Sequence, residues 1–255
     1  MAAAAFLCCS CLADKAYAGA SKDADQPQIP GPAKEYTIRS YESFSTEVGE
    51  LSGLCFNPKK DGLYAVGDEG YVYEIGLDGK TVRKLMEKSG RDWEGVDCYG
   101  SDILLVEETE SAIYSLSGGK LSLVSKIEIP GGGVSGKGPE GIMCVRDTVC
   151  VGNQAEPTRI VKYSIESGRT CGWIDINFVS RFISDLCYDS FDNTMWIIDS
   201  KGPAIYHCTL NGTLIATYHI PFVTKGEALA IDHARKTVWV GSDKTSVLYK
   251  IPIEF

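Results

Sequence analysis

The chain has 255 residues, of which 44% are hydrophobic and 23% are charged, and its formal net charge is −9 with a pI of about 4.9. The apolar fraction is that of a globular protein, which excludes wholesale disorder. The acidic balance argues against nucleic-acid binding, which needs a basic surface to displace counter-ions, but it leaves cations open as ligands. The sequence has no apolar run of 18 residues, so we expect no transmembrane helix in the mature chain.

The first 18 residues are typical of an export segment. They are small and apolar, and they end in the Ala-x-Ala pattern of a signal-peptidase site at residues 16–18. A second interpretation makes Cys11 the lipidated cysteine of a bacterial lipoprotein, and a third makes the segment a disordered tail. Residues 19–35 are rich in Pro, Asp and Gly, which indicates a linker. We predict an exported protein that is periplasmic or associated with the cell membrane, with or without a lipid anchor.

Five related segments follow the linker at intervals of about 44 residues. They open at Ser52, Glu94, Glu140, Ser184 and Glu227, which are 42, 46, 44 and 43 positions apart. Each opens a short run rich in β-branched and aromatic residues, and two more such runs follow it, which favours strands over helices. In four repeats a Gly-containing turn then precedes a fourth strand. This pattern predicts an all-β, five-bladed β-propeller over residues 36–255, with an open sandwich of the same strands as the alternative.

The two ends of this region predict how the ring closes. The fifth repeat stops at Phe255, before its fourth strand, and one additional strand-like segment lies upstream of the first repeat at residues 36–40. We therefore expect the N- and C-terminal strands to pair in the last blade, with residues 36–40 on its outer edge. Such pairing would also cover a sheet edge that could otherwise template aggregation.

Acidic residues recur in register at two positions of the repeat. Three of the five repeats open with a glutamate, and a polar pair follows the second strand of every repeat, so both sets should surround one mouth of the central channel. Carboxylates held together raise one another's pKa, and a cation would relieve their repulsion. Oxygen donors without His or Cys suit a hard ion such as Ca²⁺. The candidate ligands are Glu94, Glu140, Glu227, Asp68, Glu108, Asn153 and Asp199. The alternative is that these side chains bond to backbone groups or face water.

Several of these segments also carry a family resemblance. The relevant motifs are Ser52-Gly53-Leu54, Asp68-Glu69, Glu94-Gly95, Glu140-Gly141 and Ser184-Asp185-Leu186-Cys187-Tyr188. They resemble the SdiA-regulated proteins, also called the YjiK/CarP family, over residues 36–255. The resemblance implies an exported, envelope-associated bacterial β-propeller linked to calcium, with no established reaction. The sequence departs from the pattern at Ala228, where Gly is usual, and at Gly67, where Ser often stands.

These features support two functions of different classes. The favoured one is a non-catalytic monomeric propeller that binds a divalent cation, which the resemblance implies is calcium, together with an unidentified ligand or envelope protein. The alternative is a metal-dependent lactonase or esterase of the gluconolactonase-like kind, in which Glu94, Asn153 and Asp199 would hold the metal. No general base and no G-x-S-x-G motif support that reaction. A third alternative is a protein-binding propeller without metal.

The histidines and cysteines predict no site of their own. His207, His219 and His233 are scattered along the chain and form no i, i+4 pair. Seven cysteines follow the leader, which is an odd number. Four of them lie on first strands as two matching pairs, Cys55 with Cys187 and Cys98 with Cys144. We therefore expect mainly free, buried thiols and no obligatory disulfide framework.

Overall fold

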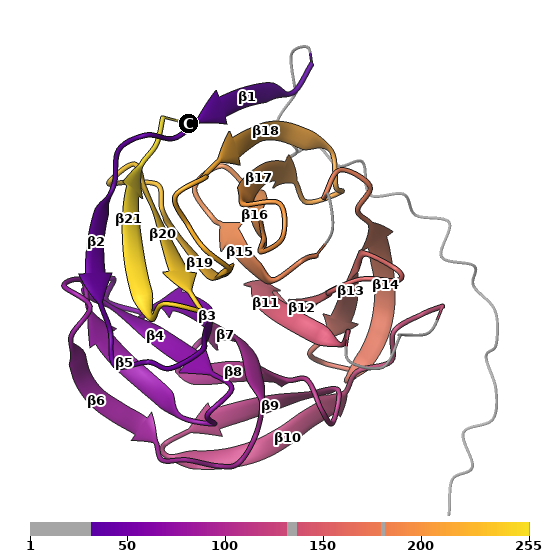
Figure 1. Cartoon of the computed structure of the whole chain (residues 1–255). Helices are drawn as coiled ribbons and strands as arrows, with labels where there is room; N and C mark the ends of the chain where they lie inside the picture. The colour runs from indigo at the N-terminus through magenta and orange to yellow at the C-terminus, as the bar shows by residue number, and fades with distance from the viewer. Residues whose placement is uncertain (1–31, 132–136, 180–181, 255) are drawn as a thin grey trace, which may run out of the picture.

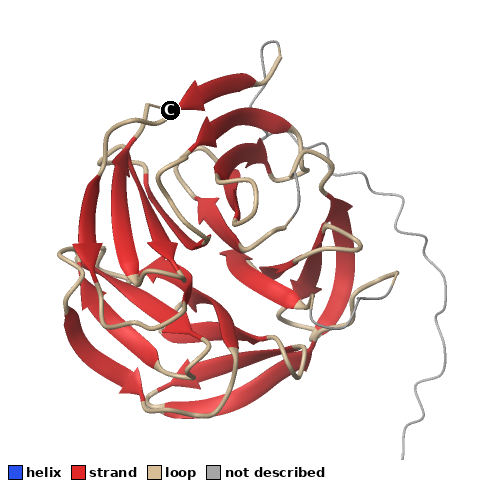
Figure 2. Ribbon diagram, in the orientation of Figure 1, coloured by secondary structure: helices blue, strands red, loops and turns tan. Residues whose placement is uncertain are grey.

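The computed structural model describes residues 32–131, 137–179 and 182–254. The regular structure in these residues consists of strands joined by loops (Figure 2), and none of it is a helix with the length and apolar character of a membrane span. The strands form five sheets arranged as a ring around a central axis (Figure 1), which confirms the predicted five-bladed propeller. The expected leader at residues 1–18 lies outside the described residues, as does most of the expected linker at 19–35.

In each blade the strands run outward from the axis in chain order and pair in antiparallel fashion. Blade 1 contains β3 (Leu51–Phe56), β4 (Gly62–Gly67), β5 (Val72–Gly76) and β6 (Thr81–Met86). Blade 2 contains β7 (Trp93–Tyr99), β8 (Asp102–Glu107), β9 (Ala112–Ser117) and β10 (Lys120–Lys126). Blade 3 contains β11 (Pro139–Val145), β12 (Thr148–Asn153), β13 (Arg159–Ser164) and β14 (Arg169–Asp175).

The last two blades each take a strand from the N-terminal region. Blade 4 contains β15 (Asp185–Asp189), β16 (Thr194–Asp199), β17 (Ala204–Thr209) and β18 (Leu214–His219), with β1 (Lys34–Thr37) parallel to β18 at its outer edge. Blade 5 contains β19 (Gly226–Asp232), β20 (Thr237–Ser242) and β21 (Val247–Pro252), with β2 (Glu42–Ser45) antiparallel to β21 as its fourth strand. Figure 1 shows both additions on the outside of the ring.

Closure by N- and C-terminal strands in the last blade is therefore confirmed, but the closing segment differs from the predicted one. Residues 36–40 do not lie on blade 5, because Tyr36 belongs to β1 and stacks on Tyr218 of blade 4 at 5.0 Å between ring centroids. The closing strand is β2, in which Phe44 is paired with Leu248 and stacks on Trp239 at 6.0 Å. Each of the two N-terminal strands therefore makes an aromatic contact with the blade to which it is added.

The hydrophobic core is divided among the interfaces between neighbouring blades. One cluster, for example, joins Trp196 and Ile198 of blade 4 to Leu229 and Val240 of blade 5. The inner strands pack very closely, because a Cβ atom on Gly141 of β11 would lie only 2.4 Å from the Cα atom of Asp185 on β15. Close packing of the five inner strands fixes the positions of the polar residues with which they begin.

All seven cysteines in the described residues are free. Cys55, Cys150 and Cys208 are buried, whereas Cys171 is exposed. Burial raises the pKa of the Cys150 thiol to about 12, so it remains a neutral, weakly polar core group at physiological pH.

Candidate cation site at one mouth of the ring

Three buried glutamates surround one end of the central axis. Glu94 on β7, Glu140 on β11 and Glu227 on β19 are 8%, 3% and 6% exposed. Each is the second residue of an inner strand, so the close packing of these strands brings their carboxylates toward the axis. The predicted first ring of acidic residues is thus assembled from blades 2, 3 and 5.

Burial and mutual repulsion raise the pKa values of these glutamates. Burial, followed by the carboxylates of Asp68 and Asp92, raises the pKa of Glu94 to about 9. Burial, followed by the carboxylates of Glu94 and Glu227, raises the pKa of Glu140 well above its usual range. Both shifts have the direction expected for like charges in a poorly solvated place. A bound cation would favour the ionised forms and oppose these shifts.

One group of closely spaced oxygen donors consists of Asp68, Asp92 and Glu94. One carboxylate oxygen from each lies within 4.8 Å of the other two, and a similar group joins Asp68 to Glu50 and Asp243. Asp68 follows β4 and Asp92 precedes β7, so blades 1 and 2 meet at this point. Burial raises the pKa of Asp68, and it raises that of Asp92 to about 6 with help from the Asp68 carboxylate. The geometry suits a cation with several oxygen ligands.

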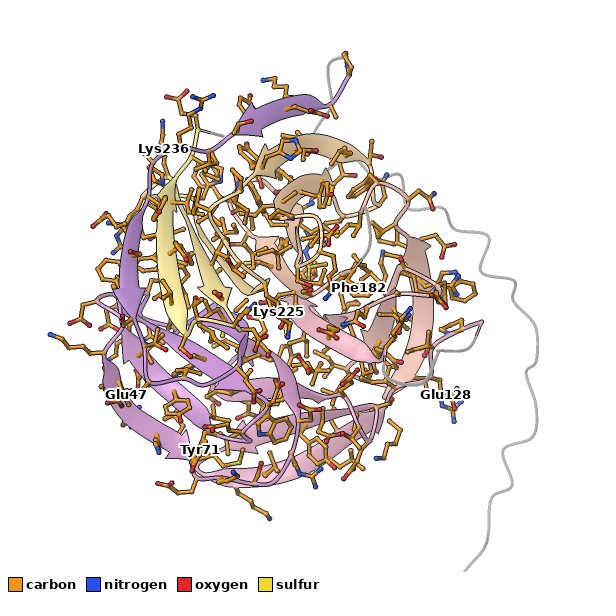
Figure 3. The ribbon with its side chains drawn as sticks, in the orientation of Figure 1. Glu47, Tyr71, Glu128, Phe182, Lys225 and Lys236 are labelled. Atoms are coloured by element: carbon orange, nitrogen blue, oxygen red, sulfur yellow. The ribbon has the colours of Figure 1, made fainter. Side chains whose placement is uncertain are left out.

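Lysine 225 supplies a positive charge within this acidic mouth. Its ammonium group lies 3.0 Å from Glu227 Oε2 and also pairs with Asp243. Burial opposes the charge, but the hydrogen bonds to Asp243 and Glu227 raise the pKa of Lys225 above its usual range. Burial raises the pKa of Glu227 to about 7, and Lys225 limits the increase. Figure 3 places Lys225 near the centre of the ring of inner strands.

Sequence reasoning missed Glu50, Asp92 and Lys225, although a periodic signal marks them. Each lies two positions before the opening residue of its repeat, in the loop that leads into the inner strand. Repeats 3 and 4 have Gly138 and Phe182 at the same position. Searching the repeat for a second polar position at a period of two would have identified this third ring.

The predicted ligands Glu108, Glu140 and Asn153 make different contacts near the loops that follow the second strands. Glu140 accepts a hydrogen bond from the Gln154 amide, and Glu108 Oε1 accepts one from the Gly138 N–H at 3.0 Å. The Asn153 amide instead donates to the carbonyl oxygens of Ala155 and Pro157 at 2.9 and 2.6 Å.

Asp199 has a comparable role in its own loop. Its Oδ1 atom accepts the backbone N–H groups of Lys201 and Gly202, both at 2.9 Å. The Asn153 and Asp199 side chains therefore shape the loops after β12 and β16. By contrast, the carboxylates of Asp68, Glu108 and Glu227 contribute to the raised pKa values of both Glu94 and Glu140 across the mouth.

The two sides of the mouth differ in character. Blades 1 and 2 contribute carboxylates, whereas Phe182 lies between the blade 3 and blade 4 sequences. The ammonium groups of Lys137 and Lys201 lie 5.7 and 5.5 Å from the centre of the Phe182 ring. Figure 3 labels both Phe182 and Lys225 toward the middle of the ring in this view. The two groups of closely spaced oxygen donors therefore share Asp68 of blade 1, and they extend to blade 2 through Asp92 and Glu94 and to blade 5 through Asp243.

The fold and this arrangement of side chains define a five-bladed β-propeller with an acidic mouth. The chain belongs to the SdiA-regulated family, whose model matches residues 32–171. Comparison with curated proteins found no match to the sequence.

Several solved structures have a similar fold at low sequence identity. Glutaminyl cyclase from Myxococcus xanthus has a TM-score of 0.70 at 11% identity, over 86% of this chain and 97% of that chain. Regucalcin from Agrobacterium tumefaciens, named as a calcium-binding protein, has a TM-score of 0.57 at 14% identity, over 88% and 96%. A chain of a nidogen/laminin complex has a TM-score of 0.55 at 12% identity, over 80% and 76%. These similarities establish the fold alone.

Proposed function

We propose that this protein is a non-catalytic propeller that binds Ca²⁺ among the carboxylates of its acidic mouth. The observation that carries the proposal is the group formed by Asp68, Asp92 and Glu94, whose oxygen atoms lie within 4.8 Å of one another. Carboxylate oxygens without nitrogen or sulfur donors favour a hard cation. Regucalcin, named as a calcium-binding protein, illustrates that this fold is compatible with such a site.

The electrostatics of the mouth support a site that exchanges protons for a cation. The pKa of Glu94 is raised to about 9, so this group carries a proton at neutral pH when no cation is bound. Ca²⁺ would bind the ionised form, and the proton would leave to solvent. Calcium takes six to eight oxygen ligands, so water and neighbouring acids such as Glu50 or Glu140 would complete its coordination.

Calorimetry and thermal melting of matched variants test this proposal. We expect saturating Ca²⁺ to raise the melting temperature of EDTA-treated protein by ~5–10 °C. This is the increase expected when the Ca²⁺ concentration is well above the dissociation constant. Glu94→Gln should abolish most of this increase. Glu128→Gln makes the same change on the exposed outside of the ring (Figure 3) and should retain it. Absence of a calcium-dependent shift in the unmodified protein, with no heat of binding, would rule the site out.

We also propose that the protein is exported and acts at the cell envelope as a monomer, with a ligand or envelope protein as its partner. The Ala-x-Ala pattern at residues 16–18 and the family membership support this. Mass spectrometry of protein purified from separated cell fractions is the test. A first residue at 19 would indicate cleavage of a signal peptide, and a lipid-modified Cys11 would indicate an anchor. An intact N-terminus in the cytosol would contradict export.

A further inference from the structure

A second group of metal-ligand side chains lies at the opposite end of the ring. Asp189 is the last residue of β15, Asp192 lies in the turn before β16, and His233 directly follows β19. Glu227 lies at the mouth as the second residue of β19, and His233 follows it by six positions of extended chain, a distance of about 20 Å. One carboxylate oxygen from each aspartate and one imidazole nitrogen lie within 4.8 Å of one another.

The Asp189–His233 pair is held in a defined orientation. The Nδ1 atom of His233 lies 2.7 Å from Asp189 Oδ2, and Asp189 Oδ1 accepts the backbone N–H of Phe191 at 3.0 Å. The exposed Phe191 ring stacks on the imidazole, with 4.0 Å between ring centroids and 18° between planes. These contacts fix the ring plane of His233 and direct one oxygen of Asp189 toward its Nδ1 atom.

Asp192 is oriented by a separate set of contacts. The Thr194 hydroxyl donates to Asp192 Oδ1, and the Nε2 atom of His207 lies 3.5 Å from Asp192 Oδ2. The same Nε2 atom lies 2.9 Å from the Thr194 hydroxyl, and the His207 ring stacks on Trp196 at 4.1 Å. Metal-binding carboxylates are commonly held by such outer contacts, which set their geometry.

The charge balance of this group also differs from that of the acidic mouth. Within the described ranges, the ion-pair partners of Asp189 and Asp192 are His233 and His207, and neither carboxylate has a lysine partner. The nearby guanidinium of Arg235 pairs with Asp232 at 2.5 Å. In this part of the described structure, the two carboxylates therefore pair with imidazole groups and with no lysine or arginine.

We propose that Asp189, Asp192 and His233 bind a divalent first-row transition metal, with Zn²⁺ as the representative ion. One imidazole nitrogen and two carboxylate oxygens are a donor set that zinc accepts readily, whereas calcium prefers oxygen donors alone. On binding, the metal would take the place of the proton between His233 Nδ1 and Asp189, and proton exchange with solvent would leave His233 as neutral imidazole with its one proton on Nε2 and its Nδ1 lone pair on the metal. The metal would join the end of β15 in blade 4 to the end of β19 in blade 5.

This site is independent of the calcium site proposed for the mouth, since it uses other residues at the other end of the blades. The two sites also differ in the class of cation that they favour. Loss of zinc binding and loss of calcium binding can therefore be observed separately in the same protein.

Zinc titration of the full chain by calorimetry tests the proposal, with Co²⁺ absorption as a spectroscopic readout of ligand type. Accessible thiols, including exposed Cys171, are alkylated first so that they do not bind metal. We expect one zinc equivalent in the unmodified protein and at least ~10-fold weaker binding in His233→Gln and Asp192→Asn. His219→Gln is the matched control, because this partly exposed histidine lies on β18, 3.6 Å from Glu35.

The same experiment separates the two cation sites. Glu94→Gln should leave zinc binding and the Co²⁺ spectrum unchanged. If circular dichroism shows that His233→Gln does not fold, Asp192→Asn decides, because it leaves the Asp189–His233 contact in place. Absence of zinc binding by the unmodified protein, or equal affinity in the folded Asp192→Asn variant, would overturn the proposal.

Discussion

The Oδ2 atom of Asp185 accepts a hydrogen bond from the backbone N–H of Leu229 at 2.8 Å, which joins the inner strands of blades 4 and 5. The same oxygen lies 3.4 Å from the backbone nitrogen of Leu54 in blade 1, and Oδ1 accepts the N–H of Leu186 at 2.8 Å. Asp185 is fully buried, and its backbone lies next to Gly141 of blade 3. A carboxylate therefore connects the inner strands of three blades just inside the acidic mouth.

Replacing this carboxylate should destabilise the whole ring. Asp185→Ala leaves three backbone N–H groups without their acceptor, so we expect a loss of about 3 kcal/mol or more in the free energy of unfolding. Urea denaturation followed by fluorescence measures the change. The control is Asp147→Ala, in the exposed turn between β11 and β12. It should change the free energy of unfolding by less than about 0.5 kcal/mol. Equal stability of the two variants would show that the Asp185 contacts contribute little.

The stability of the cation-free protein should fall as the pH rises from about 5 to 9. The folded-state pKa values of Glu94 and Glu227 are raised to about 9 and about 7 from a usual value of 4.5. Above pH 4.5 the folded state therefore binds more protons than the unfolded state, and this advantage is lost as each folded-state pKa is passed. We expect the melting temperature in EDTA to drop by roughly 5–10 °C over this range.

Calcium should reverse this trend, because it binds the ionised carboxylates. The increase in melting temperature caused by Ca²⁺ should therefore be larger at pH 9 than at pH 6. Glu94→Gln, which cannot ionise, should flatten the pH dependence in EDTA. A melting temperature in EDTA that increases from pH 5 to pH 9 would contradict the assignment of raised pKa values to the mouth.

Lys225→Met should make the mouth a stronger calcium site and a less stable structure without calcium. The substitution removes the ammonium group that pairs with Glu227 and Asp243 while keeping a side chain of similar length. We expect calcium affinity to rise by ~3-fold or more, since a nearby positive charge no longer repels the cation. Calorimetry is the measurement, and Lys120→Met, at an exposed position of the outer strand β10, is the control. Unchanged affinity would place the bound cation away from Lys225.

The two N-terminal strands should contribute unequally to stability. Phe44 of the closing strand β2 packs against the core cluster of blades 1 and 5, so Phe44→Ser should cost about 2–4 kcal/mol. Tyr36 of β1 is 39% exposed at the outer edge of blade 4, so Tyr36→Ser should cost about 1 kcal/mol or less. Urea denaturation compares the two variants directly. A larger loss in Tyr36→Ser would mean that β1, not β2, secures the ring.

Local patterns in the sequence were sufficient for the repeat, the strand type and the glutamates of the first ring. Alternating apolar residues and Gly-containing turns act over a few positions, so each blade could be predicted without knowing its neighbours. The repeat then placed Glu94, Glu140 and Glu227 at equivalent points of the ring. The candidate calcium ligands followed from that placement, and their binding of calcium stays a prediction.

Sequence alone determined the number of blades and the acidic character of one mouth, because both repeat along the chain. Only the tertiary structure decided which N-terminal segment closes the ring, because β1 and β2 are both short strands. Their positions depend on the sheet edges that β18 and β21 offer them. It also decided the Asp185 contacts and the approach of His233 to Asp189, 44 positions away. These relationships depend on packing between blades, where neighbours in space are distant in sequence.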